Sequence, residues 1–460
     1  MTARLLAYAS YRPAHELSRA AIGAALGMAQ VGAGVRAVAG FDEDPITMAV
    51  GAIRRLPPAA RRTDWLYFAT SSPVFLDKTN AAFVQAAVGG SQEALTLDVC
   101  GLSSGFAALA CASATGGTAV LSDLHTGRPG STAESEGGDG AAAFLFGDGD
   151  TAVADVVAIC SRSLDLMDRW RVPGQRFAHV AEERLIASVH GAAVDDVVAE
   201  VTGAAGLDGL PVRTVVAAPD RRLAATISAR WGRDSAVQTW HRDHVGYCGA
   251  ADVGQLTASA LDRSAAGDTI LVISAASSVG AMLLRVLRDG HPANAEGSGR
   301  RGRPVSYPDF LAWRGWLDRE PPRRPDHAAP FPAAFHRNRD WKFALTGSRC
   351  QACGAVWLPP QRMCGSCHAL DSVVPHPVAD CPARLVALTT DGITGSLAPP
   401  AMAGVVDFDG GGRMSASLTD TSPGELEPGD PVQMVFRRTW ADHGAPDYFW
   451  KGRPLPGGGR

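Results

Sequence analysis

Four cysteines in the last third of the chain constrain its fold more than any other feature. Cys350 and Cys353 form one CxxC pair, and Cys364 and Cys367 form a second pair ten residues later. Each CxxC turn directs two thiolates to one point, so two such turns supply a tetrahedral sulfur cage. Because protein fills all four positions, the pattern predicts a structural Zn²⁺ that holds a segment too small to bury its own core. Iron in a rubredoxin-like cage is the alternative, and His368 is not expected to be a ligand.

Short apolar segments separated by glycine turns follow the cysteines. Residues 383–390, 403–408, 413–419 and 432–438 alternate or run apolar and are predicted to be strands. A zinc ribbon followed by five short strands predicts an all-β OB-fold barrel. OB folds often bind nucleic acid, but this barrel has one lysine, Lys451, several acids and no row of exposed aromatics among lysines. We therefore expect no nucleic-acid partner.

The composition limits the remaining possibilities. A chain of 460 residues with 46% apolar residues should hold two or three domains, and its net charge of −4 does not favour nucleic acid or an anionic membrane. The uncharged, serine-containing run Thr269–Leu284 is 16 residues long, which is too short to span a bilayer and predicts two buried strands around a turn. The N-terminus has no apolar core of the kind that an export signal needs, and the cysteine usage suits a reducing compartment. We expect a cytoplasmic protein with no membrane association.

Residues 97–109, LDVCGLSSGFAAL, predict a buried strand, a sharp turn of small residues and a helix. Small residues let a substrate approach the backbone closely, and the helix start offers free N–H groups and a positive dipole end. A nucleophile at this turn would be placed for acyl transfer, with an oxyanion beside those amides. Ser103 and Ser104 could also simply cap the helix.

The DVCGLSSGF stretch resembles the nucleophile turn of the thiolase superfamily, in particular ketoacyl synthase III and HMG-CoA synthase. In that pattern an acidic residue lies five positions before the catalytic cysteine, and counting from Asp98 places Ser103 on the cysteine's position. We interpret Cys100 and Cys111 as small core residues, with Cys100 as the alternative nucleophile. GGDGAAAFLFGDGD resembles a mostly structural signature of the same superfamily, and FDEDPITMAV resembles the stretch that carries the HMG-CoA synthase general acid/base, which falls on Glu43. The resemblance implies a layered αβαβα domain.

Two other family positions also differ in this chain. The histidine that polarises the substrate carbonyl is replaced by Asp220, or by Ala217 on the HMG-CoA synthase spacing. The turn HVGYCGAADVG resembles the family's GNTSAASVP turn, and Tyr247 takes the place of its asparagine. Tyrosine can still donate a hydrogen bond, although it is larger. Decarboxylative or Claisen condensation is therefore disfavoured.

Two interpretations follow from these replacements. In the first, a histidine from another position, His241 or His244, activates Ser103, and Asp220 or Asp243 orients that histidine, as in serine acyltransferases. The protein would then move an acyl group from a CoA or carrier-protein thioester, with Glu43 or a histidine transferring protons. In the second, the site has lost its chemistry, and the chain is an acyl-CoA-binding or scaffolding subunit of an active thiolase or ketosynthase.

The segment from Tyr307 to Pro454 resembles the zinc-ribbon/OB family that accompanies thiolases as fused or separate acyl-CoA-associated subunits. We therefore expect an α/β chain with a thiolase-like domain (1–290), a Pro/Arg-rich connector with a short helix (291–343), a zinc ribbon (344–380) and an OB-fold domain (381–460). Thiolase-type folds are usually dimers, so the resemblance also implies a homodimer.

Overall fold

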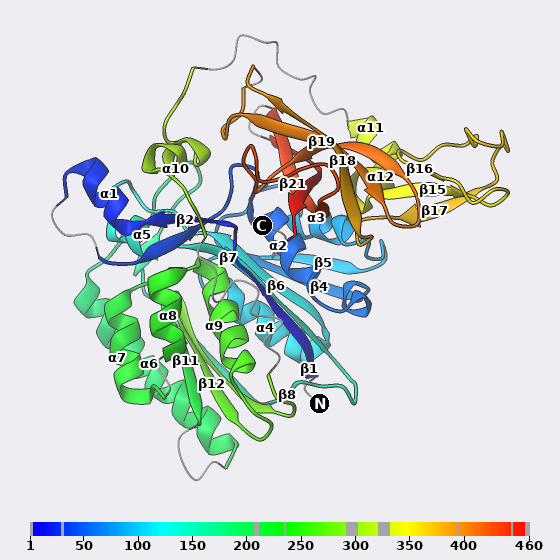
Figure 1. The fold of residues 1–460 in the computed structure, drawn as a ribbon. Coiled ribbons are helices and arrows are strands. Elements are labelled where there is room, and N and C mark those ends of the chain that lie inside the picture. Colours follow the sequence, from blue (N-terminus) through cyan, green and yellow to red (C-terminus); the bar gives the residue numbers. More distant parts are fainter. Residues whose placement is uncertain are drawn as a thin grey trace. The chain divides into compact units, whose positions relative to one another are not determined.

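A nine-stranded mixed sheet organises the first part of the chain in the computed structural model (Figure 1). From edge to edge its strands are β11 (Arg213–Ala217), β12 (Thr269–Ala275), β13 (Ser278–Val286), β8 (Ala154–Ser163), β1 (Arg4–Tyr11), β7 (Asp139–Gly147), β6 (Gly117–Leu124), β4 (Trp65–Thr70) and β5 (Leu95–Cys100). The structure describes residues 3–28, 32–206, 211–233, 236–290, 302–320, 332–393, 395–442 and 445–455. None of the helices in these ranges has the length and apolar character that crossing a membrane requires.

The sheet consists of two similar halves. In the first, helix α4 (Ser104–Thr115) leads into the antiparallel pair β6–β7; in the second, α9 (Asp252–Asp262) leads into the pair β12–β13. A single residue pair between β1 and β8, Leu5 with Ala154, joins the halves. This is the internal duplication that a thiolase-like fold implies, and the expected strands within residues 269–284 are confirmed.

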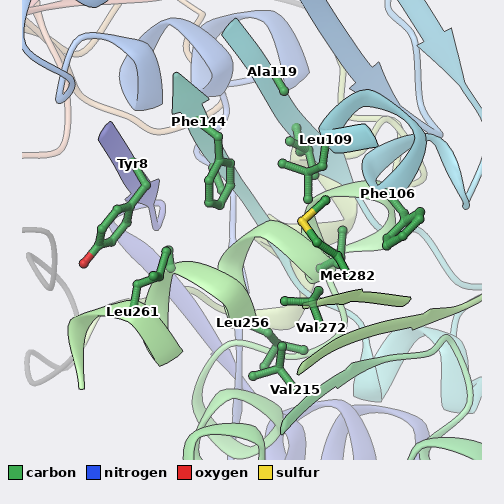
Figure 2. Close-up of a cluster of buried hydrophobic side chains, with 14 of the residues drawn as sticks. Tyr8, Phe106, Leu109, Ala119, Phe144, Val215, Leu256, Leu261, Val272 and Met282 are labelled. Atoms are coloured by element: carbon green, nitrogen blue, oxygen red, sulfur yellow. The ribbon is translucent and has the colours of Figure 1, made fainter. Parts of the chain in front are cut away.

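Helices α4 and α9 form the central layer. Their apolar side chains, among them Phe106, Leu109, Leu256 and Leu261, share one core with Phe144, Val272 and Met282 of the strands (Figure 2). The intervening residues of β12 and β13 point the other way, into a second core with α6 (Glu183–Ala204) and α7 (Arg221–Trp231). Helix α2 (Pro45–Ile53) packs on β1, β6 and β7. The order α–β–α–β–α is the layering expected from the sequence.

Smaller elements complete this part of the chain. They are β2 (His15–Ser18), α1 (Arg19–Leu26), β3 (Val35–Val38), a 3₁₀ turn (Pro58–Arg61), α3 (Asn80–Ala87), α5 (Thr132–Glu136), β9 (Arg169–Trp170), β10 (His179–Val180), α8 (Ala236–His244), a second 3₁₀ turn (Gly249–Ala251) and β14 (Arg303–Pro304). Strands β9 and β10 pair as an antiparallel hairpin.

The rest of the chain forms the zinc-ribbon candidate and a barrel. After α10 (Tyr307–Trp313), α11 (Pro332–Arg337) and α12 (Arg339–Ala344), a three-stranded sheet is formed by β16 (Val356–Trp357), β15 (Thr346–Cys350) and β17 (Val373–Pro377). The closed barrel follows the order β18 (Ala383–Asp391), β19 (Ala401–Phe408), β20 (Arg413–Leu418), β22 (Ala445–Pro454) and β21 (Pro431–Asp442). The predicted five-stranded OB barrel is confirmed.

Contacts divide the chain into two units whose boundaries interleave in sequence. The first unit contains residues 1–39, 44–85 and 91–307, and the second contains residues 40–43, 86–90 and 308–460. The main division falls within the predicted connector, 291–343. Residues 291–301 and 321–331 of that connector lie outside the described residues, and the three boundaries between the four predicted segments stay predictions.

Candidate functional site

The turn between β5 and α4 places Ser103 immediately before the first helical residue. Gly101 makes the reversal with a φ of 113°, a conformation that favours glycine, and its N–H donates to the carbonyl of Thr70 at 3.0 Å. Asp98 fixes the preceding strand, because its carboxylate accepts hydrogen bonds from the backbone of Asn80 (2.7 Å) and Ala81 (2.8 Å). The serine side chain therefore lies at the positive end of a helix dipole.

The partners of Ser103 come from the other half of the sheet. Its Oγ lies 3.0 Å from the Oγ of Ser277, a residue 174 positions away, and accepts the N–H of Ser278 at 2.8 Å. Ser277 is exposed and Ser103 is partly buried, so the hydroxyl pair lies near solvent. Among the described residues, Ser103 Oγ bonds to no imidazole and no carboxylate. The two serines, and not an acid–base pair, are what the structure brings together at this turn.

One buried carboxylate that was not predicted from the sequence, that of Asp123, fixes the backbone near the turn between β5 and α4, which we call the elbow. Asp123, at the end of β6, accepts the N–H groups of Ser71 (3.0 Å) and Ala250 (2.8 Å) and the hydroxyls of Ser71 and Ser72. Burial raises the pKa of Asp123, and these donors oppose that rise. A Cβ on Gly249 would lie 2.2 Å from Asp123 Oδ2, so glycine is required there. Asp123 thus ties the end of β4 to the turn that carries Tyr247.

Tyr247 lies buried in that turn. The edge of the His125 ring meets its ring at 5.0 Å between centroids, and the guanidinium carbon of Arg242 lies 5.2 Å from its centroid. Burial, and then the charge of Asp252, raise the pKa of Tyr247 well above its usual value. Its hydroxyl therefore stays protonated, and it makes no hydrogen bond within the described residues.

The two candidate histidines occupy different environments. His241 is buried, and its Nε2 lies 3.0 Å from Asp252 Oδ1. His244 is exposed at the end of α8, where it stacks on Trp240 and bonds through Nδ1 to the Trp240 carbonyl at 3.0 Å. Neither ring contacts Ser103 Oγ, and the proposed activation of Ser103 by a histidine stays a prediction.

The two candidate orienting carboxylates are also engaged elsewhere. Asp220 caps α7, where its side chain accepts the N–H of Leu223 at 2.8 Å. Asp243 Oδ1 lies 3.5 Å from Arg221 Nη2. The Asp220 pattern was readable from sequence as a helix start, since Asp is a favoured N-cap.

One expectation about the cysteines is wrong. Cys100 and Cys111 were interpreted as core residues, but both are exposed. Cys100 ends β5, the edge strand of the sheet, and Cys111 is not among the buried residues of α4. Partial desolvation of its sulfur, and then the negative charge of Asp98, raise the pKa of Cys100, which disfavours the thiolate.

Glu43 belongs to a buried ion cluster of the second unit. Arg437 Nη2 lies 3.1 Å from Glu43 Oε1 and donates to Asp420 at 3.0 Å, and Lys451 donates to Asp42 at 2.8 Å. Glu43 Oε2 also accepts the N–H of Gly40 at 2.8 Å. Both oxygens of this carboxylate have partners, and the general acid/base role of Glu43 stays a prediction.

The four cysteines of the ribbon converge as the spacing predicted. Their sulfurs all lie within 4.8 Å of one another, with 3.7 Å between Cys350 and Cys367 and 3.5 Å between Cys353 and Cys364. Metal–sulfur bonds of about 2.3 Å in a tetrahedron give sulfur–sulfur edges of about 3.8 Å. The donor set and the spacing therefore fit a tetrahedral metal ion.

The two CxxC turns repeat the same backbone geometry. Gly354 and His368 each follow the second cysteine of a pair with a positive φ, 77° and 59°, and each N–H donates to the carbonyl of the first cysteine at 2.9 Å. Backbone N–H groups of Cys367 and Ser366 lower the pKa of Cys364 to about 6, which favours a thiolate. His368 thus occupies the turn position that Gly354 occupies in the first pair, and its expected exclusion from the metal ligands stays a prediction.

Comparisons with known proteins place both parts of the chain. A family model described as ChsH2, C-terminal OB-fold domain, matches residues 379–437. A DUF35 domain-containing scaffold protein of Methanothermobacter thermautotrophicus is 30% identical over 118 residues, which are 25% of this chain and 88% of that protein. A hydroxymethylglutaryl-CoA synthase of Pyrococcus furiosus is 28% identical over 189 residues, which are 36% of this chain. The match spans 51% of that synthase, about half of its length.

Solved structures agree with the fold of the first unit. An HMG-CoA synthase complexed with CoA superposes with a TM-score of 0.59 at 18% identity, over 67% of this chain and 89% of that one. The HMG synthase of the curacin biosynthetic pathway, in complex with acetyl donor-ACP, superposes with a TM-score of 0.56 at 16% identity, over 68% and 88% of the chains. These likenesses establish a thiolase-like fold.

Proposed function

The chain belongs to the family of DUF35 domain-containing scaffold proteins and carries a thiolase-like fold, and from this premise we propose that it transfers acyl groups from a pantetheine thioester through Ser103. The observation that carries the proposal is the pairing of Ser103 Oγ with Ser277 Oγ and the Ser278 N–H at a helix N-terminus. Similarity to proteins whose structures hold CoA or a carrier protein supports a thioester of either kind as donor.

The reaction uses hydroxyl chemistry in place of thiol chemistry. Ser103 Oγ attacks the thioester carbonyl, the carbon–sulfur bond breaks, and an ester to Ser103 forms. The hydroxyl proton passes through Ser277 Oγ, 3.0 Å away, to the departing thiolate. An acceptor nucleophile then attacks the ester, and its proton returns to Ser103.

Fixed hydrogen-bond donors assist these steps. The Ser278 N–H, 2.8 Å from Oγ, stabilises negative charge that develops on that oxygen, and the dipole of α4 acts in the same direction. The Tyr247 turn packs against the same helix, since a Cβ on Gly105 would lie 1.9 Å from the carbonyl oxygen of Ala250. We assign to the protonated hydroxyl of Tyr247, which this turn carries, the donor role that an asparagine has in the related family.

Intact-mass analysis tests this proposal. The full chain is incubated with acetyl-CoA and with butyryl-CoA, and its mass is compared with that of the Ser103→Ala and Cys100→Ala variants. We expect an added acyl mass in the wild type and in Cys100→Ala, and its loss in Ser103→Ala. An adduct that persists in Ser103→Ala refutes the role of Ser103.

A non-catalytic scaffolding role is the second candidate, favoured by one feature of the site. Within the described residues no imidazole or carboxylate contacts Ser103 Oγ, and general-base assistance is typically worth about 10²–10⁴ in rate. A relative is named a scaffold protein. The absence of both adduct and turnover with CoA and carrier-protein thioesters, together with co-purification of an active thiolase or ketosynthase, would support this role.

We infer that the four-cysteine cluster holds Zn²⁺ as a structural ion. All four ligands are thiolates, which suit zinc, and they fill its tetrahedron, so the metal supplies stability and no open position for chemistry. A homodimer is supported by β5, which is an edge strand of the nine-stranded sheet within the described residues, because an edge strand can pair with a second copy. A cytoplasmic location and a thiolase or ketosynthase partner complete the proposal.

A further inference from the structure

The turn that carries Tyr247 is held from both sides by the helices that flank it. The carbonyl of His241, in the last turn of α8, accepts the N–H of Gly246 at 2.9 Å. Asp252, the first residue of α9, accepts the N–H of Cys248 at 3.1 Å through Oδ1. The residue before Tyr247 and the residue after it are therefore each tied to a helix end.

The carboxylate of Asp252 also joins the two helices to each other. It is fully buried, with Oδ1 3.0 Å from His241 Nε2 and Oδ2 3.6 Å from Arg242 Nη2. Burial alone would raise the pKa of Asp252, but the charge of Arg242 and the bond to His241 outweigh it and hold this pKa below its usual value. The group is thus ionised at neutral pH, and the guanidinium of Arg242 faces its negative charge.

Arg242 extends this network to the aromatic ring of Tyr247. Its guanidinium carbon lies 5.2 Å from the ring centroid, and both side chains are buried. Its Nη2 also donates to the carbonyl of Ala218 at 2.5 Å. A desolvated cation over an aromatic face is attracted to it. The place of the Tyr247 ring therefore depends on the guanidinium, and the guanidinium in turn faces Asp252.

We propose that Asp252 is a positioning residue for acyl transfer, which fixes Tyr247 through the Cys248 N–H and through Arg242 and so places the Tyr247 hydroxyl. The inference rests on the proposed function, because that function assigns the donor role to this hydroxyl. Asp252 and Tyr247 then act as one unit, since removing the first misplaces the donor and removing the second deletes it. Residues that act as a unit have strongly non-additive effects on rate.

A double-mutant cycle on the acylation rate tests this role. The full chain is mixed with acetyl-CoA, and the rate constant is taken from the growth of the acyl mass in Asp252→Asn, Tyr247→Phe and the double variant. Asparagine keeps the shape and an oxygen for the Cys248 N–H but cannot neutralise Arg242. We expect Tyr247→Phe to slow acylation by about 10²-fold and Asp252→Asn by about tenfold or more, and the double variant to be no slower than Tyr247→Phe. The acetyl-CoA concentration at half-maximal rate should stay within about twofold, because positioning acts on the reacting step and a loss of folded protein would lower only the yield.

A control and a second variant accompany the cycle. Asp195 of α6 also faces an arginine, Arg230, and accepts the Trp231 Nε1–H at 2.9 Å, so Asp195→Asn makes the same chemical change elsewhere and should leave the rate constant unchanged. Arg242→Met removes the cation from the Tyr247 ring without altering the carboxylate. It should slow acylation and be equally non-additive with Tyr247→Phe, which keeps the test decisive where Asp252→Asn does not fold.

The outcomes separate this inference from the proposed function. A rate constant unchanged in Asp252→Asn or in Arg242→Met, or losses that multiply in the double variant, overturns the positioning role and leaves acyl transfer standing. A slowing of equal size in Asp195→Asn overturns it as well. Absence of an adduct in the wild type refutes acyl transfer itself, and the positioning role falls with it.

Discussion

Replacing Gly105 with alanine should force helix α4 away from the turn that carries Tyr247 and Ala250. A Cβ at this position would lie 1.9 Å from the carbonyl oxygen of Ala250 and 2.8 Å from Leu121 Cδ2. A carbon–oxygen contact needs about 3.3 Å, so the two backbones must move apart by about 1.4 Å. Neither neighbouring backbone is free to yield, since Ala250 N–H is also held by Asp123 at 2.8 Å.

The expected cost is that of overpacking a rigid core, about 2–3 kcal/mol. For a unit of this size that corresponds to a melting temperature lowered by roughly 4–12 °C. The assay is thermal unfolding of the full chain followed by circular dichroism. Acyl-adduct formation should fall as well, because the displaced elbow no longer holds Ser103 against the Ser278 N–H.

Gly191→Ala is the matched control. This glycine also lies within a helix, α6, but a Cβ there would meet no atom within 4 Å. Alanine should therefore stabilise the protein by about 0.5–1 kcal/mol through helix propensity. If the melting temperature of Gly105→Ala equals that of Gly191→Ala or exceeds that of the wild type, the close approach of α4 to the Tyr247 turn is refuted.

Three further predictions address the pH response and the metal centre. Because His125 has a folded pKa of about 3, below its unfolded value near 6.5, the unfolded chain binds the extra proton between those values, so stability should fall by about 1.4 kcal/mol per pH unit below pH 6.5. His125→Phe should flatten that slope in denaturant titrations, and an unchanged slope would contradict the burial of a neutral imidazole. Cys353→Ser should lower the bound zinc measured by plasma mass spectrometry, whereas Cys381→Ser should leave one zinc per chain; equal zinc in both variants would exclude the four-thiolate centre. His368→Gly should stabilise the chain by about 0.5 kcal/mol in chemical unfolding, since glycine adopts the φ of 59° without steric cost, and should keep the zinc; metal loss there would make the imidazole a ligand.

Features set by local spacing were predictable from the sequence. The four-cysteine cage, the strand–turn–helix around Ser103 and the barrel strands all depend on residues close together in the chain, and the structure confirms each arrangement. Asp220 shows the same point, because an aspartate before a helix caps it whatever lies beyond.

Features set by distant partners were not predictable. Asp123 is an ordinary residue at the end of a strand until the fold brings Ser71 and Ala250 to it. Ser277 likewise could not be recognised as a site residue from the sequence, because only the fold brings it within hydrogen-bond distance of Ser103.

The ion cluster around Arg437 affects how this polypeptide can be divided. Two of its carboxylates, Asp42 and Glu43, come from a four-residue stretch near the N-terminus, while Arg437 and Lys451 come from the barrel strands. A fragment expressed from residue 308 onward would keep Asp420 but lose Asp42 and Glu43, the two carboxylates that face these buried cations. No single peptide cleavage therefore yields a barrel with its ion cluster intact. Grafting the barrel onto another protein would require residues 40–43 to be included as well.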